Sequence, residues 1–391
     1  MVIEYEEPKL YNDCDADGII IDWKEIFRLY DELRCPPDVY NPTELPIDDA
    51  AWFVLTSERN TGKTTNLVLL AMLLYLKYGC ISAYIRQKSD MITPKEMQNF
   101  FNVILANHYI EKMTDGKYNG VRYFARHYRF VKWDDEGKRA EESTPFMWCG
   151  DLAENLTYKS VLNLPKCNMI IYDEFIGADY LANEFVTLCD LHKTIGRNRL
   201  GIKLFLCANT TNYYHEYFRE LLIQEEVLNC KVNHSFIKVT PLGTKIYYKM
   251  IGDKSRKREL VNTSYYGFSN PRLKSITGGD WSVNSYPHIT REERHKILTD
   301  RYIKFNERYY QIELVQSERL GIHCIVHRAN EPREGYIYTI DEIRSTNEHF
   351  KFGTMHIDNY IWQRRKENKW YYADNDVGFT VESYVNRANR I

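Results

Sequence analysis

Short apolar segments rich in β-branched and aromatic residues recur along the first half of the chain. They predict buried strands and cover residues 51–56, 81–85, 167–172 and 202–208. Between the first two, residues 65–76 are mostly apolar, which predicts a buried helix that stops at Gly79. A helix returning to the same sheet forms a βαβ unit with parallel strands. The predicted fold class is α/β, a parallel sheet flanked by helices.

The pattern predicts further elements around this core. Helical spacing of apolar residues covers 23–33, 97–109 and 179–194. Residues 122–148 are polar and aromatic and indicate a hairpin at the edge of the sheet. An amphipathic stretch and a strand-like stretch follow over 213–250.

The last hundred residues change to a β-rich pattern. Residues 309–315 and 320–326 predict a hairpin, and 336–340 and 369–372 predict further strands. A helix is expected between those two strands, and residues 381–388 are expected to be helical. The result is a smaller α+β domain at the C-terminal end.

Composition narrows the class of protein. The net charge is −2 among 391 residues, so the chain as a whole gives no basic signal for nucleic acid. Nine cysteines without a Cys-x-x-Cys pair argue for reduced thiols in a cytosol-like compartment and against a zinc site or a disulfide framework. The acidic N-terminus does not look like a signal peptide, and the longest apolar run is too short to span a bilayer. No membrane association is expected.

The most informative motif lies between the first predicted strand and the helix after it. Strand, loop, Gly-Lys-Thr and helix form the context of a phosphate-binding P-loop, because loop N–H groups and the helix N-terminus attract anions. Lys63 is expected to reach the β- and γ-phosphates of ATP, and the Thr64 hydroxyl to ligate Mg²⁺. Ser57 replaces the usual first glycine, where a small residue suffices. The expected nucleotide-binding residues are Ser57, Glu58, Arg59, Asn60, Thr61, Gly62, Lys63, Thr64 and Thr65.

A second motif ends the strand at 167–172. Asp173 is positioned to hold Mg²⁺ through water, and Glu174, which points the other way, to polarise the attacking water. Alone, this pair is also compatible with a strand-end turn. Together with the P-loop it predicts an ATP-hydrolysing site with its own general base. A water-activating carboxylate argues against a small-molecule kinase.

Polar residues also flank the strand at 202–208 on both sides. Asn209 at its tip is expected to contact the γ-phosphate or the lytic water, although it could instead cap the next helix. Arg197 and Arg199 precede the strand, at the end of the sheet opposite its own phosphate site. An arginine there can serve a neighbour's ATP in a ring, as an arginine finger in trans. The alternative is a pair of surface ion-paired arginines.

These motifs resemble the DNA-packaging ATPases of the small tailed phages of the phi-twenty-nine group, which are related to large terminases. The matching residues span about 50–215 and comprise Arg59 in the P-loop, Tyr84-Ile85-Arg86, residues 170–175, Arg197-Asn198-Arg199 and residues 206–209. The resemblance implies an additional-strand, catalytic-glutamate P-loop NTPase with ATP and Mg²⁺ as cofactors. It implies Glu174 as the base and Arg197 as the trans-acting finger, with Arg59, Lys63 and Asn209 also catalytic.

The resemblance also implies partners and a place of action. They are double-stranded DNA, a homo-oligomeric ring that is pentameric in that family, the capsid portal or connector, and a structural packaging RNA. The protein is expected in the host cell cytoplasm, transiently at the procapsid portal vertex.

The expected organisation is an N-terminal extension (1–50), a P-loop ATPase domain (51–250), a linker (251–290) and a nuclease-like C-terminal domain (291–391). The linker holds a basic run at 254–258, either a solvated loop or a nucleic-acid contact. By resemblance, the last domain has a ribonuclease-H fold without its metal carboxylates. Its first hairpin strand has no aspartate, although Asp341, Asp374 and Asp376 are available.

The sequence therefore predicts an ATP-driven motor that moves double-stranded viral DNA into a procapsid. The cluster Arg364-Arg365-Lys366 could contact nucleic acid or be a solvated helix face. Alternative functions are a large-terminase-like packaging enzyme with an active nuclease, a helicase or loader, and a non-catalytic nucleotide-binding scaffold. Lys63, Asp173 and Glu174 argue against the last.

Overall fold

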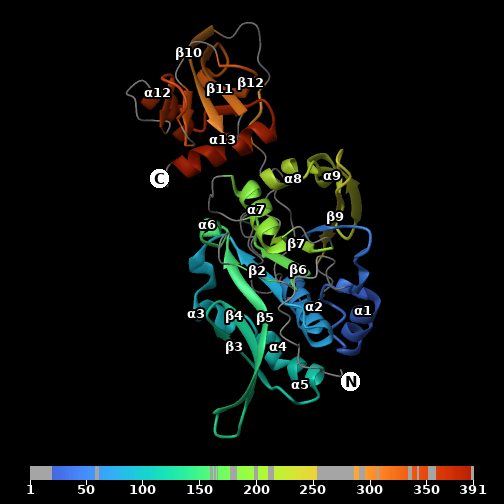
Figure 1. Cartoon of the computed structure of the whole chain (residues 1–391). Helices are drawn as coiled ribbons and strands as arrows, with labels where there is room; N and C mark the ends of the chain where they lie inside the picture. The colour runs from blue at the N-terminus through green and yellow to red at the C-terminus, as the bar shows by residue number, and fades with distance from the viewer. Residues whose placement is uncertain are drawn as a thin grey trace, which may run out of the picture. The chain divides into compact units, whose positions relative to one another are not determined.

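A computed structural model describes residues 20–57, 61–158, 162, 164, 166–176, 183–197, 201–209, 215–252, 286–289, 296–305, 308–332, 337–340, 343–350 and 358–388. The chain divides into two compact units. Strands β1 to β9 belong to the first and β10 to β15 to the second (Figure 1). The linker, including the basic run at 254–258, lies almost wholly outside the described residues, and the domain boundaries stay predictions.

The first unit is built on a nine-stranded sheet in the order β3-β4-β5-β2-β6-β7-β1-β9-β8. Its six central strands are all parallel, which confirms the predicted sheet. They are β5 (Arg139–Asp151), β2 (Ser82–Arg86), β6 (Met169–Asp173), β7 (Lys203–Asn209), β1 (Trp52–Ser57) and β9 (Lys245–Ile251). The strands predicted from apolar runs are the four in the middle, where both faces are covered.

Antiparallel strands extend the sheet at both edges. β3 (Gly120–Phe124) and β4 (His127–Trp133) continue it beyond β5, which confirms the edge hairpin. On the other side β8 (Ser235–Val239) pairs with β9. β5 pairs with β4 over residues 139–148 and with β2 over residues 147–151. The long hairpin that β4 and β5 form is visible in Figure 1.

Helices cover both faces of the parallel strands (Figure 1). α2 (Lys63–Tyr78) is buried over nearly its whole length and stops at Gly79, whose φ of 65° is left-handed. Ile171 packs in the same hydrophobic cluster as α2, whereas its neighbour Tyr172 points to α7 (Glu184–Gly196) on the opposite face. α1 (Trp23–Glu32) lies against α2. Further α-helices of this unit are α6 (Asn155–Tyr158), α8 (Glu216–Glu220) and α9 (Gln224–Asn229).

The single helix predicted over 97–109 is wrong. The chain instead forms three short helices, α3 (Pro94–Asn99), α4 (Asn102–Ala106) and α5 (Tyr109–Thr114). His108 adopts a φ of 54°, which cannot continue a right-handed helix. Breaking the helix buries Phe101, Ile104 and Ile110 in one core, which the apolar spacing alone did not reveal.

The second unit has a six-stranded sheet in the order β14-β13-β10-β11-β12-β15. The strands are β10 (Lys296–Phe305), β11 (Arg308–Ser317), β12 (Gly321–Ala329), β13 (Ile337–Thr339), β14 (Glu348–Phe350) and β15 (Trp370–Tyr372). β10, β11 and β12 form an antiparallel meander, and β13 and β14 add in parallel beside β10. α12 (Asp358–Lys366) and α13 (Asn375–Ala388) contribute to its core. The predicted hairpin is the second and third strands of this meander.

The meander begins one strand earlier than the sequence indicated, and that strand carries Asp300. Asp300 accepts a 2.7 Å hydrogen bond from Gln311 on β11. Asp374 caps α13 and Asp376 pairs with Arg328, while Asp341 is outside the described residues. In the part of the chain that the structure describes, no three His, Cys, Asp or Glu side chains gather as a metal site.

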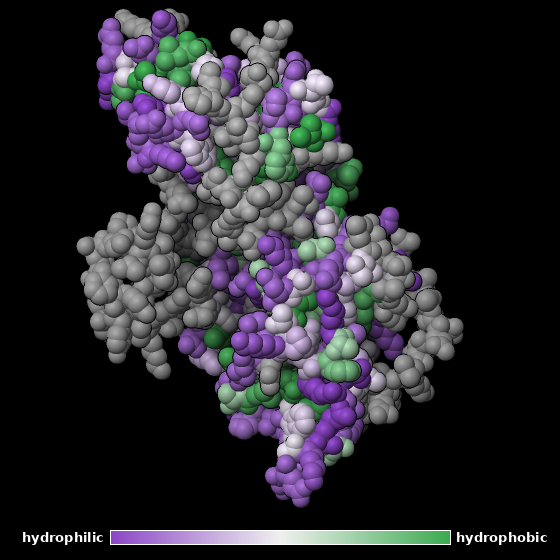
Figure 2. Space-filling model, turned by 90° about the vertical axis from the view of Figure 1, so that its left-hand side faces the viewer, coloured by the Kyte–Doolittle hydropathy of each residue, from purple (hydrophilic) through white to green (hydrophobic). Residues whose placement is uncertain are grey.

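The surface of the described residues is mixed in polarity. On the face shown in Figure 2, hydrophilic and hydrophobic residues are interspersed. In the basic cluster of α12, Arg365 pairs with Glu382 at 2.5 Å and Arg364 with Glu367 at 3.1 Å. Among the described helices, none has the length and apolar character needed to cross a bilayer.

Candidate active site

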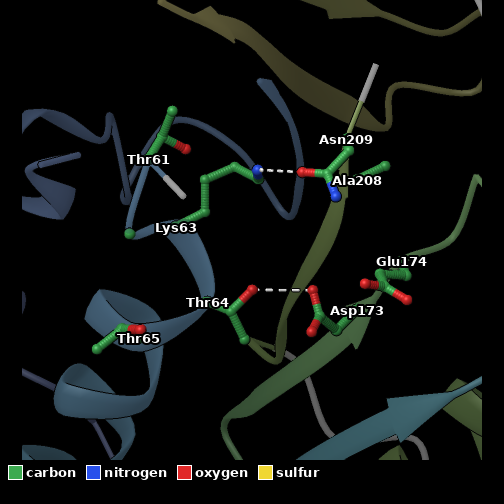
Figure 3. A pocket seen from close by; sticks show the side chains of 9 residues that line it. Thr61, Lys63, Thr64, Thr65, Asp173, Glu174, Ala208 and Asn209 are labelled. Carbon is green, nitrogen blue, oxygen red and sulfur yellow. Dashed lines mark hydrogen bonds between the residues drawn. The ribbon is translucent and has the colours of Figure 1, made fainter. Parts of the chain in front are cut away.

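The predicted phosphate-binding residues meet at the carboxyl ends of β1, β6 and β7, beside the N-terminus of α2. Because these strands are neighbours in the order β6-β7-β1, their ends form one edge, with Ser57 opposite Asn209 and Asp173 opposite Cys207. A pocket of about 190 Å³ opens there (Figure 3). Its lining residues are Thr61, Gly62, Lys63, Thr64, Thr65, Asp173, Glu174, Ala208 and Asn209.

The loop before α2 depends on Gly62. Its φ of 80° is left-handed, and a Cβ on this residue would lie 3.0 Å from Cβ of Val39. Both conformation and space therefore demand glycine. This turn aims the start of α2, with its free N–H groups, into the pocket. Glu58, Arg59 and Asn60 of the same loop lie outside the described residues.

Lys63 is the first residue of α2 and is buried, with its ammonium group inside the pocket (Figure 3). Nζ donates to Ser57 Oγ and lies 3.5 Å from Asn209 Oδ1. Burial lowers the pKa of Lys63, against the opposing effects of Cys207, Asp173 and Glu174. An ammonium ion held by neutral oxygens is suited to bind an anion that enters the pocket.

Thr64 and Asp173 form the second pair across the pocket. The Thr64 hydroxyl donates a 2.9 Å hydrogen bond to Asp173 Oδ1 (Figure 3). Tyr84 on β2 donates to the other carboxylate oxygen at 2.9 Å. A hydroxyl and a carboxylate oxygen at this separation fit a Mg²⁺ ion, which prefers oxygen ligands and keeps several waters.

Arg86 ends the predicted second strand on the ligand side of the sheet, where the sequence left open whether it contacts the ligand or lies in a solvated loop. Its guanidinium donates to Asp173 Oδ2 at 3.2 Å and to Glu174 Oε2 at 2.5 Å. Burial disfavours its charge, but Tyr84, Asp173 and Glu174 together raise the pKa of Arg86 above its ordinary value. The available signal was its position at the end of β2, because β2 pairs with β6 and brings the two strand ends together.

Glu174 lies at the mouth of the pocket. Its φ is 57°, and its side chain is 50% exposed, in contrast to 12% for Asp173. Glu174 forms a left-handed turn directly after β6, and its carboxylate and that of Asp173 both line the pocket (Figure 3). Glu174 is therefore open to solvent water while Asp173 is enclosed.

A buried carboxyl behind the site was not anticipated. Glu184, at the start of α7, accepts hydrogen bonds from Tyr172 on β6, from Gln87 at 2.6 Å and from Tyr217 on α8 at 3.1 Å. Burial raises the pKa of Glu184 to about 7, against these donors. Gln87 follows Arg86 and Tyr172 precedes Asp173, so Glu184 binds the side chains of the immediate neighbours of two site residues. Its sequence signal, one acidic residue beginning a helix, is indistinguishable from an ordinary helix start.

Arg197 is not among the residues that line the pocket. It follows α7, is exposed, and donates to the carbonyl of Leu162 at 2.9 Å. It precedes β7, whose far end carries Asn209, so it is on the amino side of a strand whose carboxyl end forms the site. Arg199 lies outside the described residues. A role in trans stays a prediction.

Comparison with known proteins identifies similar chains in phages. No family model matches. A DNA packaging protein of Bacillus phage phi29 is 21% identical over 233 residues, which is 58% of this chain and 63% of the relative. The DNA packaging protein of Bacillus phage PZA gives the same values. The chain thus spans somewhat less than two thirds of these curated relatives.

Two solved structures align over almost the whole chain. A chain of the bacteriophage Phi-29 viral genome packaging motor assembly has a TM-score of 0.57 and 17% identity, covering 90% of this chain and 99% of that one. The chain has the fold of a phage packaging-motor protein. The Phi-28 gp11 DNA packaging motor gives a TM-score of 0.52 and 16% identity, covering 91% and 99%. Both alignments extend through the two units, so the resemblance inferred from the motifs of residues 50–215 is confirmed and extended.

Proposed function

We propose that this protein is an ATP-hydrolysing motor that translocates double-stranded viral DNA into a procapsid. The observation that carries the proposal is the single pocket that unites Lys63, Thr64, Asp173, Glu174 and Asn209. A cation, a hydroxyl–carboxylate pair, an exposed carboxylate and an amide are the groups that phosphoanhydride hydrolysis requires. The similarity to packaging proteins supports DNA as the substrate that is moved.

In this proposal each residue has a distinct task. Lys63 and the loop N–H groups bind the β- and γ-phosphates, and Asn209 orients the γ-phosphate or the water beside it. Thr64 and Asp173 hold Mg²⁺, which neutralises phosphate charge when bound. Arg59, outside the described residues, is proposed to assist in the same loop.

Glu174 is proposed to be the general base. Its carboxylate is exposed at the mouth, where it can accept a proton from water as that water attacks phosphorus. Arg86 binds Oε2 of the carboxylate and fixes its position, while Oε1 is outside this ion pair. The proposal therefore gives Arg86 a positioning role.

The assembly is proposed from the relatives and from the place of Arg197. We propose a homo-oligomeric ring, a pentamer, in which Arg197 of one subunit reaches the ATP of the next. The ring acts at the capsid portal in the host cytoplasm, with a structural packaging RNA as a further partner. DNA contact is mainly to phosphates, and it is salt-sensitive and independent of sequence.

The decisive test is steady-state ATP turnover by the purified chain, with and without long double-stranded DNA. The proposal predicts turnover that rises with DNA and falls by about 10² to 10⁴-fold in Glu174→Gln, the usual contribution of a general base. Glu225→Gln, on the exposed side of α9, is the matched control and keeps wild-type turnover. ATP binding without turnover, also in the presence of procapsids, would indicate a nucleotide-binding scaffold instead.

Two further measurements separate the motor from related activities. Strand separation without movement along duplex DNA would indicate a helicase or loader. Metal-dependent DNA cleavage lost in Asp300→Asn would indicate an active nuclease in the second unit, because Asp300 is the carboxylate on its first strand.

A further inference from the structure

The turn that carries Asp173 and Glu174 has an unfavourable backbone conformation. Glu174 follows β6 directly and has a φ of 57°, in the left-handed region that residues with a Cβ rarely adopt. Such a conformation persists only where the surrounding structure holds it. Arg86 binds the two carboxylates of the turn, which are side-chain groups, so the backbone needs support of its own.

The residues on both sides of the carboxylate pair are buried and fixed. Tyr172 precedes the pair and Phe175 follows it, and both side chains are fully buried. The Phe175 N–H also donates to the Cys207 carbonyl on β7 at 3.2 Å. The two carboxylates of Figure 3 therefore lie between two anchored aromatic residues, and a movement of either anchor would move the turn.

One buried carboxyl, that of Glu184, connects these two anchors. Glu184 begins α7, and its Oε1 accepts from the Tyr172 hydroxyl and from the Tyr217 hydroxyl on α8, the latter at 3.1 Å. The Tyr217 ring meets the Phe175 ring in a T-shaped contact, with 5.2 Å between the ring centres. Direct contacts therefore run without a gap from one side of the turn to the other.

The other oxygen of Glu184 reaches the strand end that carries Arg86. Oε2 accepts from Gln87 Nε2 at 2.6 Å, and Gln87 is buried directly after Arg86. Because β2 and β6 are neighbours in the sheet, this bond ties the end of one strand to the end of the other. Glu184 thus links the segments that supply both partners of the ion pair between Arg86 and Glu174.

An apolar side chain could fill the space of Glu184 but could not make these contacts. Burial of a carboxyl is costly, and it raises the pKa of Glu184 in spite of the three donors, with Glu216 of α8 adding to the rise. In return, the carboxyl offers two acceptor oxygens that fix the positions of three donors from three separate segments. Tyr172 and Tyr217 are the titratable groups among those donors.

We propose that Glu184 is a positioning residue for ATP hydrolysis, which keeps Glu174 and Arg86 in the catalytic geometry by holding the three donors. The inference rests on the proposed function, in which Glu174 is the general base. Glu184 is not among the residues that line the phosphate pocket. Its loss should therefore lower the rate of hydrolysis and leave ATP binding unchanged.

Steady-state kinetics and equilibrium ATP binding of single variants test this proposal. Glu184→Gln keeps the size of the side chain and leaves one acceptor oxygen in place of two. Its kcat should fall by about tenfold to a hundredfold, the range for a catalytic group that is slightly misplaced, while KM and the affinity for ATP stay at the wild-type values. Tyr172→Phe and Tyr217→Phe each remove one hydroxyl and should lower kcat in the same direction, by less.

The double variant Glu184→Gln, Tyr172→Phe shows whether the two side chains act together. If Glu184 acts through Tyr172, the fall in kcat is smaller than the product of the two single falls, because the second change removes a bond that is already impaired. Single effects that multiply in full would mean independent roles and would overturn the proposal.

Tyr128→Phe is the matched control for the loss of a buried hydroxyl. Tyr128 on β4 is buried in the same unit and donates to the Met97 carbonyl at 2.6 Å, and neither residue lines the phosphate pocket. This variant should keep wild-type kcat. A fall equal to that of Tyr172→Phe would show that turnover responds to any such loss, and would contradict a specific role.

The outcomes separate this inference from the proposed function. Wild-type kcat in Glu184→Gln, while Glu174→Gln is inactive, overturns the positioning role and leaves the hydrolytic site intact. A loss of ATP affinity that accounts for the whole effect of Glu184→Gln overturns it as well. No turnover by the wild type overturns the proposed function itself. Should Glu184→Gln fold poorly, the two tyrosine variants decide: lowered kcat at unchanged ATP affinity supports the proposal, and wild-type kcat in both contradicts it.

Discussion

Thr64 and Asp173 are joined by a 2.9 Å hydrogen bond that connects the first turn of α2 to the end of β6. The same two oxygens are the proposed Mg²⁺ ligands. Thr64→Val removes the hydroxyl and keeps the shape, and should lower Mg²⁺-dependent ATP turnover by about tenfold or more. Thr64→Ser keeps the hydroxyl and should retain most activity. Mg²⁺ titrations of turnover measure the difference, and equal curves for both variants would exclude the hydroxyl as a ligand.

Arg86 should matter for turnover more than for ATP binding. Arg86→Ala leaves the neighbouring carboxylates of Asp173 and Glu174 without their shared cation, so Glu174 loses its fixed position. Turnover should fall by about 10² or more, within the range of a misplaced general base. Arg86→Lys keeps the charge without the fork and should be intermediate.

The control for Arg86 is Arg122→Ala, which removes a comparable arginine paired with Glu142 on the edge hairpin. Wild-type turnover in that variant shows that the effect is local. If Arg86→Ala instead lost ATP affinity in proportion to turnover, the residue would serve binding and not the base.

Glu184 predicts a specific pH dependence of stability. Its pKa is about 7 when folded against an ordinary 4.5, so the folded state holds the proton more tightly. This contribution is complete below pH 4.5 and is lost as the pH rises to 7, at a cost of up to about 3 kcal/mol. Relative to Glu184→Gln, the wild-type free energy of unfolding should therefore fall between pH 5 and 8. Denaturant unfolding at several pH values measures it, and parallel curves would show ordinary titration.

Arg301 and Asp358 form a buried ion pair in the second unit, 3.0 Å from Nε to Oδ1, to which Tyr338 also donates. Asp358→Ala leaves Arg301 buried without its carboxylate and should destabilise this unit by about 3–5 kcal/mol. The double variant Arg301→Met, Asp358→Leu removes both charges and should recover much of the loss. Thermal unfolding distinguishes them, and an additive loss in the double variant would mean that packing, not charge, is responsible.

Arg197 can be tested by mixing inactive chains. If it acts in trans, Arg197→Ala chains and Lys63→Ala chains should each have little turnover, and their mixture should regain some. Interfaces in the mixture that pair an intact Lys63 with a neighbour's intact Arg197 account for the gain. Chains with both substitutions bring neither group, so mixing them with Arg197→Ala chains is the control and should give no recovery. No recovery under conditions where wild-type rings assemble would argue for a role within one subunit.

The sequence alone was sufficient where the signal is local. The apolar strands, the buried α2 and the residues at the ends of β1, β6 and β7 were predicted because each strand with its following turn is a continuous stretch of chain. The parallel direction of these strands followed from the βαβ rule. The proposed roles of Lys63, Thr64, Asp173 and Glu174 need only that these ends meet.

The tertiary structure decided what depends on partners far apart in the chain. Arg86 meets Glu174 because β2 lies beside β6, and Glu184 is buried because β6, α7 and α8 converge on it. The pocket lined by residues 38–44, Thr61 and the end of β9 exists because the Tyr40 N–H donates to the Thr61 carbonyl, far along the chain, opposite the end of β9. The spacing of apolar and polar residues along the chain does not reveal such contacts, since the same polar residues on an exposed surface would produce the same pattern. Hydrophobic patterning reports which face of a segment is buried, whereas only the completed fold determines what that face meets.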